Sequence, residues 1–402
     1  MLINTKLLYF SLIILFLSSS LFGVFHLLHL DSISTLGQYV VVLVSAIIII
    51  SLKNTFYRKI DIYFITIFLV LLSFSCWIGL YFENDVNRVV IDFITIFLPI
   101  LTFIKIKNSE TQFDSYFLEK FINIVLVVSI IQACLMFILK TIVDIPFNLT
   151  FSSPLYSLLL LVFYVKRNYI KLIIVFIVII VGGKRSPLLM AGISFSFYHI
   201  FYYFSYLTKE RIIKLFSLHI FLVFLIFMIM LNIDYLVNIN PELAKLESLN
   251  IFSDNFNFYK FSTGRLEEVI IAYRTILEKG DFAILTGGGL GFNFMYYLPQ
   301  FNFEEVRNNL HISLFSILFK YGLLFFVAFY FFLFFNIGNL YKKTKNNHNK
   351  EQLILLSYIF AYIIFYSNTS SAFIIDYTFW FLFGIAFLIN NSKKESNVQK
   401  NI

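Results

Sequence analysis

Charged residues are scarce in this chain: Asp, Glu, Lys and Arg make up 13% of its 402 residues, while 59% are hydrophobic and 20% are aromatic. A soluble domain of this size needs far more charge on its surface, so the composition indicates an integral membrane protein. Cysteine is nearly absent as well. Cys76 and Cys134 both fall in apolar stretches, which indicates neither a disulfide framework nor a thiolate metal site.

Apolar stretches dominate the chain. A window of about 19 residues finds about twelve candidate membrane-spanning helices. They lie near residues 7–30, 36–52, 60–82, 89–104, 119–143, 154–166, 170–183, 187–206, 212–236, 309–335, 352–368 and 371–390. The sequence therefore predicts an all-α, polytopic membrane protein. Its expected parts are nine helices in residues 1–236, a large polar loop with short helices in residues 237–308, and three helices with a basic tail in residues 309–402.

Basic residues are distributed unevenly between the loops. With Lys6 placed inside, most Lys and Arg residues fall in alternate short loops and few fall in the opposite ones. Because cytoplasmic loops carry the excess of Lys and Arg, both termini are predicted to be cytoplasmic and the large loop to face outward. The net charge of +8 then follows from topology, and no nucleic-acid partner is needed to explain it.

The large loop contains one segment with helical periodicity, residues 263–279. Its apolar residues recur at helical spacing on one expected face: Leu266, Val269, Ile270, Tyr273, Ile276 and Leu277. Arg265 lies in the first turn, where the helix dipole disfavours a cation unless an anion is bound there. Arg265 is therefore a candidate anion ligand, with a solvated arginine as the alternative.

A glycine-rich run follows this helix, from Gly287 to Gly291. Such glycines allow positive φ and can leave backbone N–H groups open to a phosphate, which makes Gly287, Gly289 and Gly291 candidate substrate-binding residues. The run matches neither a dinucleotide fingerprint nor a Walker loop, so nucleotide binding is not expected. A flexible re-entry loop is the alternative interpretation.

His311 lies just inside the outer edge of the tenth expected helix, after Arg307. A histidine there can accept a proton from a hydroxyl near neutral pH, or it can be structural. Lys320 is expected about 13 Å deeper, at about 1.5 Å per residue. An ionisable group near the middle of a bilayer needs a partner, and Asp92 and Asp376 are the candidates.

A second basic pair, Lys184 and Arg185, departs from the positive-inside pattern because it falls at an outward turn before Ser186. Paired cations at a helix junction suit a diphosphate group, and arginine offers a bidentate fork. Topological noise is the alternative interpretation. His26 and His29 lie three residues apart but lack a third ligand, so no metal site is expected.

Taken together, these motifs resemble the O-antigen polymerase and O-antigen ligase superfamily of bacterial inner-membrane glycosyltransferases. The matching features follow the family's order through residues 180–325: Lys184-Arg185-Ser186, Gly264-Arg265, Gly287 to Gly291, and His311 followed eleven residues later by Gly322. Two positions depart from the family pattern. Ile312 stands where the family often has Asn, and Lys320 stands where it often has an acidic residue.

The resemblance implies transfer of a glycan from an undecaprenyl-diphosphate-linked donor to a sugar hydroxyl, on the periplasmic face of the bacterial inner membrane. Arg185 and Arg265 would then hold the diphosphate, and His311 would activate or position the acceptor hydroxyl. The other implied substrate-binding residues are Lys184, Gly264, Gly287, Gly289, Gly291, Arg307 and Lys320. The resemblance implies no cofactor and no metal, and it implies the lipid bilayer and a chain-length regulator protein as partners.

Polymerisation of lipid-linked repeat units into O-antigen or capsule is the favoured function. The motifs do not separate it from the ligase reaction, which transfers the glycan to a lipid A core or a protein. A flippase or transporter for lipid-linked glycans would explain Lys320, Asp92 and Asp376 but not the long outer loop. A structural scaffold would leave Arg185, Arg265 and His311 unexplained.

Overall fold

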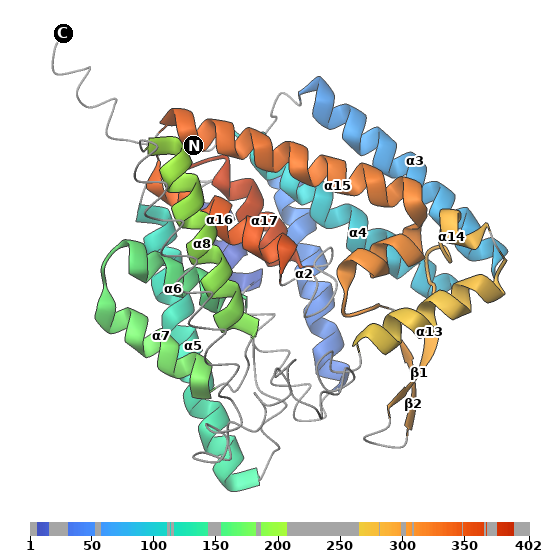
Figure 1. Ribbon diagram of the computed structural model, residues 1–402, viewed down its shortest axis with the longest axis horizontal. Coiled ribbons are helices and arrows are strands. Elements are labelled where there is room, and N and C mark those ends of the chain that lie inside the picture. The colour runs from blue at the N-terminus through green and yellow to red at the C-terminus, as the bar shows by residue number, and fades with distance from the viewer. Residues whose placement is uncertain are drawn as a thin grey trace, which may run out of the picture.

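The computed structural model describes residues 6–15, 31–52, 58–110, 113, 116–143, 154–181, 186–206, 265–280, 282–298, 303–307, 309–347, 349–365, 367 and 376–389. Helices make up most of this part of the chain (Figure 1). Among the described residues, four helices are long and apolar enough to cross a membrane: Lys59–Tyr81, Val86–Lys107, Phe117–Cys134 and Ser313–Asn346. The protein thus has the helices of a membrane protein.

The observed helices follow the expected apolar stretches. In chain order they are a short helix over Lys6–Leu15 and then α2 (Asp31–Ser51), α3 (Lys59–Tyr81), α4 (Val86–Lys107), α5 (Tyr116–Val143), α6 (Leu155–Val165), α7 (Tyr169–Val181), α8 (Ser186–Tyr206), α13 (Arg265–Glu278), α14 (Ala283–Thr286), α15 (Ser313–Asn347), α16 (Lys350–Ile364) and α17 (Tyr377–Ala386). α6 and α7 are 11 and 13 residues long, shorter than the roughly 20 residues that cross a bilayer. The helix expected over 212–236 lies outside the described residues.

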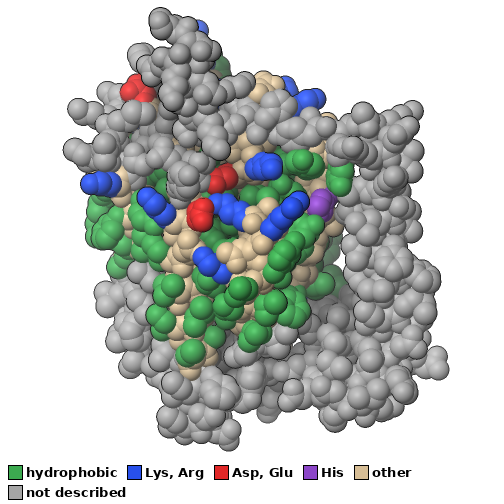
Figure 2. Space-filling model, turned by 90° about the vertical axis from the view of Figure 1, so that its left-hand side faces the viewer, with side chains coloured by type: hydrophobic (Ala, Val, Ile, Leu, Met, Phe, Trp, Pro, Cys, Tyr) green, Lys and Arg blue, Asp and Glu red, His purple; other side chains and the backbone are tan. Residues whose placement is uncertain are grey.

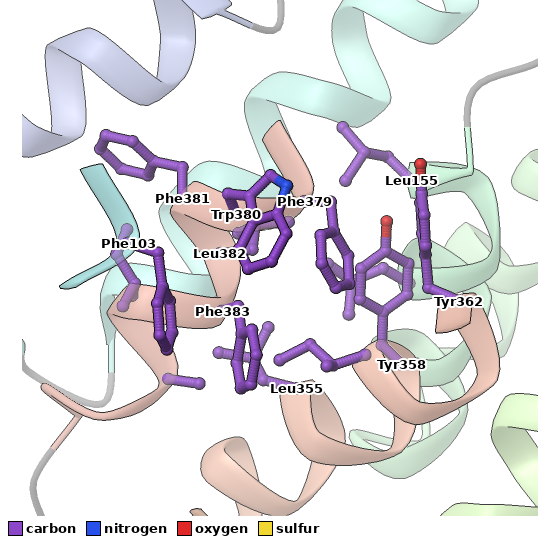
Figure 3. Close-up of a cluster of buried hydrophobic side chains, with 14 of the residues drawn as sticks. Phe103, Leu155, Leu355, Tyr358, Tyr362, Phe379, Trp380, Phe381, Leu382 and Phe383 are labelled. Carbon is purple, nitrogen blue, oxygen red and sulfur yellow. The ribbon is translucent and has the colours of Figure 1, made fainter. Parts of the chain in front are cut away.

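Aromatic side chains from α3, α4, α15 and α17 pack at the centre of the molecule. The ring of Phe332 meets Phe68 edge to face at 5.2 Å and Phe103 at 5.6 Å between centroids. Phe103 in turn contacts Trp380 at 5.8 Å, and all four side chains are fully buried. Figure 3 shows Phe103 on one side of Trp380 and Phe383, with Tyr362 on the other. Edge-to-face pairs of this kind add to the stabilisation from burial.

The two ends of the bundle formed by α3, α4 and α15 differ in chemistry. At one end Lys107 Nζ, in the last turn of α4, donates to Asp61 Oδ1 at 2.6 Å and to Asn336 Oδ1 at 2.8 Å. Lys and Arg side chains gather on the left-hand side of Figure 1, the face that Figure 2 shows. At the opposite end, Gly79 near the end of α3 packs against the backbone of Leu290.

α15 is not the straight span that was expected over 309–335. Gly322 has φ 81° and ψ 170°, so the helix breaks there, and this conformation is essentially restricted to glycine. A Cβ on Gly322 would lie 2.6 Å from the carbonyl oxygen of Leu285. The segment before the break folds back beside α13 (Figure 1). The depth expected for Lys320 assumed one straight helix across the membrane, and it stays a prediction.

The large loop contains a β-hairpin, which corrects the expectation of an all-α chain with short helices alone. β1 (Phe294–Leu298) pairs antiparallel with β2 (Phe303–Arg307). Phe294 and Tyr296 are buried while Met295 and Tyr297 are exposed, which is the alternation of a half-buried strand. Strands of five residues leave a much weaker sequence signal than long apolar helices do.

α13 confirms the helix expected over 263–279, but its buried face differs from the expected one. Its buried residues are Glu268, Ala272 and Ile276. Ile270, Tyr273 and Leu277, three residues of the expected apolar face, are 49%, 41% and 39% exposed. The face toward the protein therefore centres on a carboxylate and small or apolar neighbours, since contacts with β1 and α15 decide the orientation.

Candidate functional site

A buried carboxylate, Glu268, lies at the centre of a polar cluster between α13, β2 and the start of α15. The residue is 2% exposed. His311 Nδ1 lies 2.9 Å from both carboxylate oxygens, and the His311 backbone N–H donates to Oε2 at 3.2 Å. The guanidinium of Arg307 forms an ion pair with Oε1. A charge this deeply buried needs such partners, and in return it fixes the orientation of the imidazole.

The hairpin positions Arg307, which is the last residue of β2. Its guanidinium carbon lies 4.5 Å from the centroid of the Tyr296 ring in β1, a favourable cation–π distance. Burial lowers the pKa of Arg307 from its ordinary value, and the group still stays charged at neutral pH. The strand pairing therefore holds a permanent cation next to Glu268.

Arg265 is the first residue of α13, one helical turn before Glu268. Residues three apart on a helix lie on one face, with Cβ atoms about 5–6 Å apart. Arg265 is partly buried, so it adds a second cation to the same side of the helix. The structure thus brings Arg307 and His311 together on Glu268, and the helix spacing puts Arg265 on the same side of α13.

This arrangement suits proton transfer beside an anionic group. With its Nδ1 proton toward the carboxylate, the His311 imidazole carries its lone pair on Nε2. The side chain remains 40% exposed. A histidine oriented by a carboxylate is the arrangement of a general base, and nearby arginines stabilise phosphate oxygens. Within the described ranges, no group of three or more His, Cys, Asp or Glu residues could hold a metal ion.

The glycine-rich turn is packed tightly between α3 and α15. A Cβ on Gly289 would lie 2.2 Å from the backbone nitrogen of Gly79, and a Cβ on Gly287 would lie 2.6 Å from that of Gly322. Gly287 and Gly289 have φ of 75° and 78°, which glycine alone adopts readily. Glycines at these positions let the loop backbone touch the backbones of two helices.

Protein acceptors engage the N–H groups of this turn. The donors and acceptors are Gly288 N–H to Phe319 O at 2.7 Å, Leu290 N–H to Ser75 O at 2.9 Å, and Gly291 N–H to Asp92 Oδ2 at 2.7 Å. Asn84 Nδ2 also donates to the carbonyls of Gly288 and Leu290. The turn therefore has a packing role in place of the open N–H groups expected from the sequence, and substrate binding by Gly287, Gly289 and Gly291 stays a prediction.

Lys320 forms a buried polar contact next to the site. Its Nζ lies 2.7 Å from Asp92 Oδ2, which confirms Asp92 as the partner, and it also donates to Asn309 Oδ1 at 3.4 Å. Lys320 is 1% exposed. The other candidate partner, Asp376, instead caps α17. Lys320 thus links α4 to the residues just before His311, and a direct contact of Lys320 with substrate stays a prediction.

The sequence did not single out Glu268 as a site residue. An acidic residue in the first turn of a helix is explained by the helix dipole alone, so Glu268 looked like its neighbour Glu267. Only the structure distinguishes Glu268, because it shows that Glu268 lies one and two turns before Ala272 and Ile276 on the face that packs. Lys184, Arg185 and Gly264 lie outside the described residues, so the predicted convergence of Arg185 with Arg265 stays a prediction.

Comparisons of the chain with protein-family models, with curated proteins and with solved structures found no match. Function is therefore inferred from the sequence motifs and from the chemistry of the cluster around Glu268.

Proposed function

We propose that the protein is a membrane glycosyltransferase that joins undecaprenyl-diphosphate-linked repeat units into surface polysaccharide. The observation that carries this proposal is the 2.9 Å contact between His311 Nδ1 and the carboxylate of Glu268, with Arg265 and Arg307 on the same side. A base flanked by cations suits a reaction that removes a hydroxyl proton while a diphosphate leaves. Its place beside apolar helices suits a donor whose tail stays in lipid.

In the proposed reaction, the acceptor sugar hydroxyl attacks the anomeric carbon of the donor glycan. A new C–O bond forms, the bond from that carbon to the diphosphate oxygen breaks, and undecaprenyl diphosphate leaves as an anion. His311 Nε2 takes the hydroxyl proton, and Glu268 stabilises the imidazolium that results. Arg265 and Arg307 stabilise the charge on the leaving group, with Arg185 as the further ligand that the motifs suggest.

The same proposal includes the topology: about twelve spans, cytoplasmic termini and a periplasmic loop over residues 237–308 in a bacterial inner membrane. The uneven ends of the helix bundle support it. Lys105 and Lys107 lie in the last turn of α4, and Lys345 lies in the last turn of α15. These basic ends suit the cytoplasmic side, and the cluster around Glu268 then faces outward.

The test is an assay of chain growth with the purified protein in lipid nanodiscs and a defined lipid-linked repeat unit. We expect Arg265→Ala to lower the rate roughly 30- to 1000-fold, equivalent to about 2–4 kcal/mol of transition-state stabilisation. Arg274→Ala is the matched control, because Arg274 is exposed on another face of α13. Equal rates for the two variants would refute the diphosphate role.

One observation favours a transporter as the second candidate. One ion pair, Lys320 with Asp92, lies between two candidate spans with the Lys320 side chain buried, and intramembrane charges often mark transport paths. Movement of a labelled lipid-linked unit across vesicles without chain growth would support this second candidate. Growth on a lipid A core acceptor alone would instead identify the ligase reaction.

A further inference from the structure

Helix α13 presents three faces of different chemistry. One face packs on the protein, with Glu268, Ala272 and Ile276 buried. A second face, about 130° around the helix at 3.6 residues per turn, is exposed and apolar and contains Ile270, Tyr273 and Leu277. The third face is exposed and charged and contains Glu267, Arg274 and Glu278. Packing on the protein explains the first face only. The exposed apolar face and the exposed charged face therefore indicate two other environments around α13.

The exposed apolar face continues through α14 into a membrane-spanning helix. Phe282 and Leu285 are 80% and 53% exposed. The carbonyl of Leu285 lies against Gly322 at the break in α15, and Leu323 and Leu324 directly after the break are 40% and 69% exposed. α15 is long and apolar enough to cross a membrane. In a bilayer its exposed apolar residues face lipid, and α14 adjoins them at the break.

Exposed aromatic residues lie at the end of α3 that packs against the turn after α14. Phe74, Trp77 and Tyr81 are exposed in its last turns and stack on one another at 6.1 and 6.0 Å between centroids. Trp and Tyr concentrate where a membrane meets water. The end of α3 is fixed to the turn after α14 by the contact of Gly79 with Leu290. Both elements thus lie at one boundary.

We propose that α13 and α14 rest in the outer lipid–water boundary of a phospholipid bilayer. The apolar ridge, defined as Ile270, Tyr273, Leu277, Phe282 and Leu285, enters the lipid, while the charged face of α13 stays in water. This is the binding mode of an amphipathic interfacial helix. It places the cluster around Glu268 at the depth of the lipid head groups, where a substrate with a lipid tail reaches it from within the membrane. The proposal does not depend on the glycosyl-transfer reaction.

Spin labels on neighbouring residues of α13 test the proposal in the full chain. The background carries Cys76→Ser and Cys134→Ser, which removes both native thiols. Tyr273→Cys and Leu277→Cys place labels on the ridge. The matched controls place them on the charged face: Arg274→Cys and Glu278→Cys. Each protein is reconstituted in phosphatidylcholine–phosphatidylglycerol nanodiscs, and relaxation by oxygen, which concentrates in lipid, is compared with relaxation by a water-soluble nickel chelate.

We expect the oxygen-to-nickel accessibility ratio to be severalfold higher at both ridge positions than at both control positions. A ratio that is equal at all four positions would show a helix surrounded by water and would overturn the proposal. Ridge labels shielded from both reagents would overturn it as well, because another part of this chain or a second copy would then cover the ridge. Two positions on each face keep the comparison valid when one variant fails to elute as a folded protein.

Discussion

Replacing the carboxylate of Glu268 by an amide gives the sharpest test of the proposed base. Glu268→Gln keeps the size of the side chain but removes its charge and one of its two acceptor oxygens. In the native protein those oxygens accept from His311 Nδ1 and the His311 backbone N–H, and they pair with Arg307. The amide cannot satisfy all three donors, so the imidazole loses its fixed orientation and the stabilisation of its protonated form.

General-base catalysis contributes roughly 10²- to 10⁴-fold to a rate, which corresponds to about 3–5 kcal/mol. We expect Glu268→Gln to lower kcat within this range and to leave KM close to the native value, because Glu268 acts through His311. Glu267→Gln is the matched control: Glu267 is adjacent and exposed, and its variant should keep the native kcat. The assay measures elongation of a lipid-linked repeat unit by the purified protein.

A double variant separates this role from a general structural one. Residues that act as one catalytic unit show non-additive losses. Glu268→Gln combined with His311→Ala should therefore be no slower than His311→Ala alone. Losses that multiply, or full activity of Glu268→Gln, would refute the assignment of Glu268 as the residue that orients the base.

Three further predictions concern stability, measured as the thermal unfolding midpoint in detergent. Gly322→Ala should destabilise the protein by roughly 1–3 kcal/mol or more, from backbone strain and from the clash with α14. Gly338→Ala is the control in the same helix and should not destabilise the protein, because a Cβ there meets nothing within 4 Å. Lys320→Met should cost up to about 3–5 kcal/mol because it leaves the partly buried Asp92 without its cation. Adding Asp92→Asn, which removes the charge and keeps an acceptor for the Gly291 N–H, should recover much of the loss. Burial raises the pKa of Glu351, in the first turn of α16, from 4.5 to about 7, so the stability of the native protein should fall as pH rises through that interval. Glu351→Gln should be more stable than the native protein above pH 7 but not below pH 4.5. An equal effect of this substitution at both pH values would contradict the prediction.

The long helices could be predicted because a membrane span needs about 20 apolar residues, and so long a run is hard to miss in the sequence. α3 and α4 begin and end within a few residues of the expected bounds. The break in α15 could not be predicted, because it depends on the contact of Gly322 with α14, which lies far away in the sequence. The hairpin was missed because each strand is only five residues long.

Part of the candidate site was visible in the sequence. Arg265, Arg307 and His311 stand out because ionisable groups are scarce in this chain. Glu268 was not visible, since its burial depends on how α13 rotates against β1 and the start of α15, and tertiary contacts set that rotation. The glycine turn was visible as a special backbone, but its packing against Gly79 required the arrangement of the helices.

The most direct test of glycosyl transfer is to quantify the released undecaprenyl diphosphate. Purified protein in nanodiscs is given a defined undecaprenyl-diphosphate-linked repeat unit, and free undecaprenyl diphosphate is quantified by mass spectrometry alongside the glycan products. Glycosyl transfer requires the release of one undecaprenyl diphosphate for every bond formed, and His311→Ala should lower the formation of both products together, roughly 10²- to 10⁴-fold. Intact substrate without release, or release without longer glycan, would contradict the central claim.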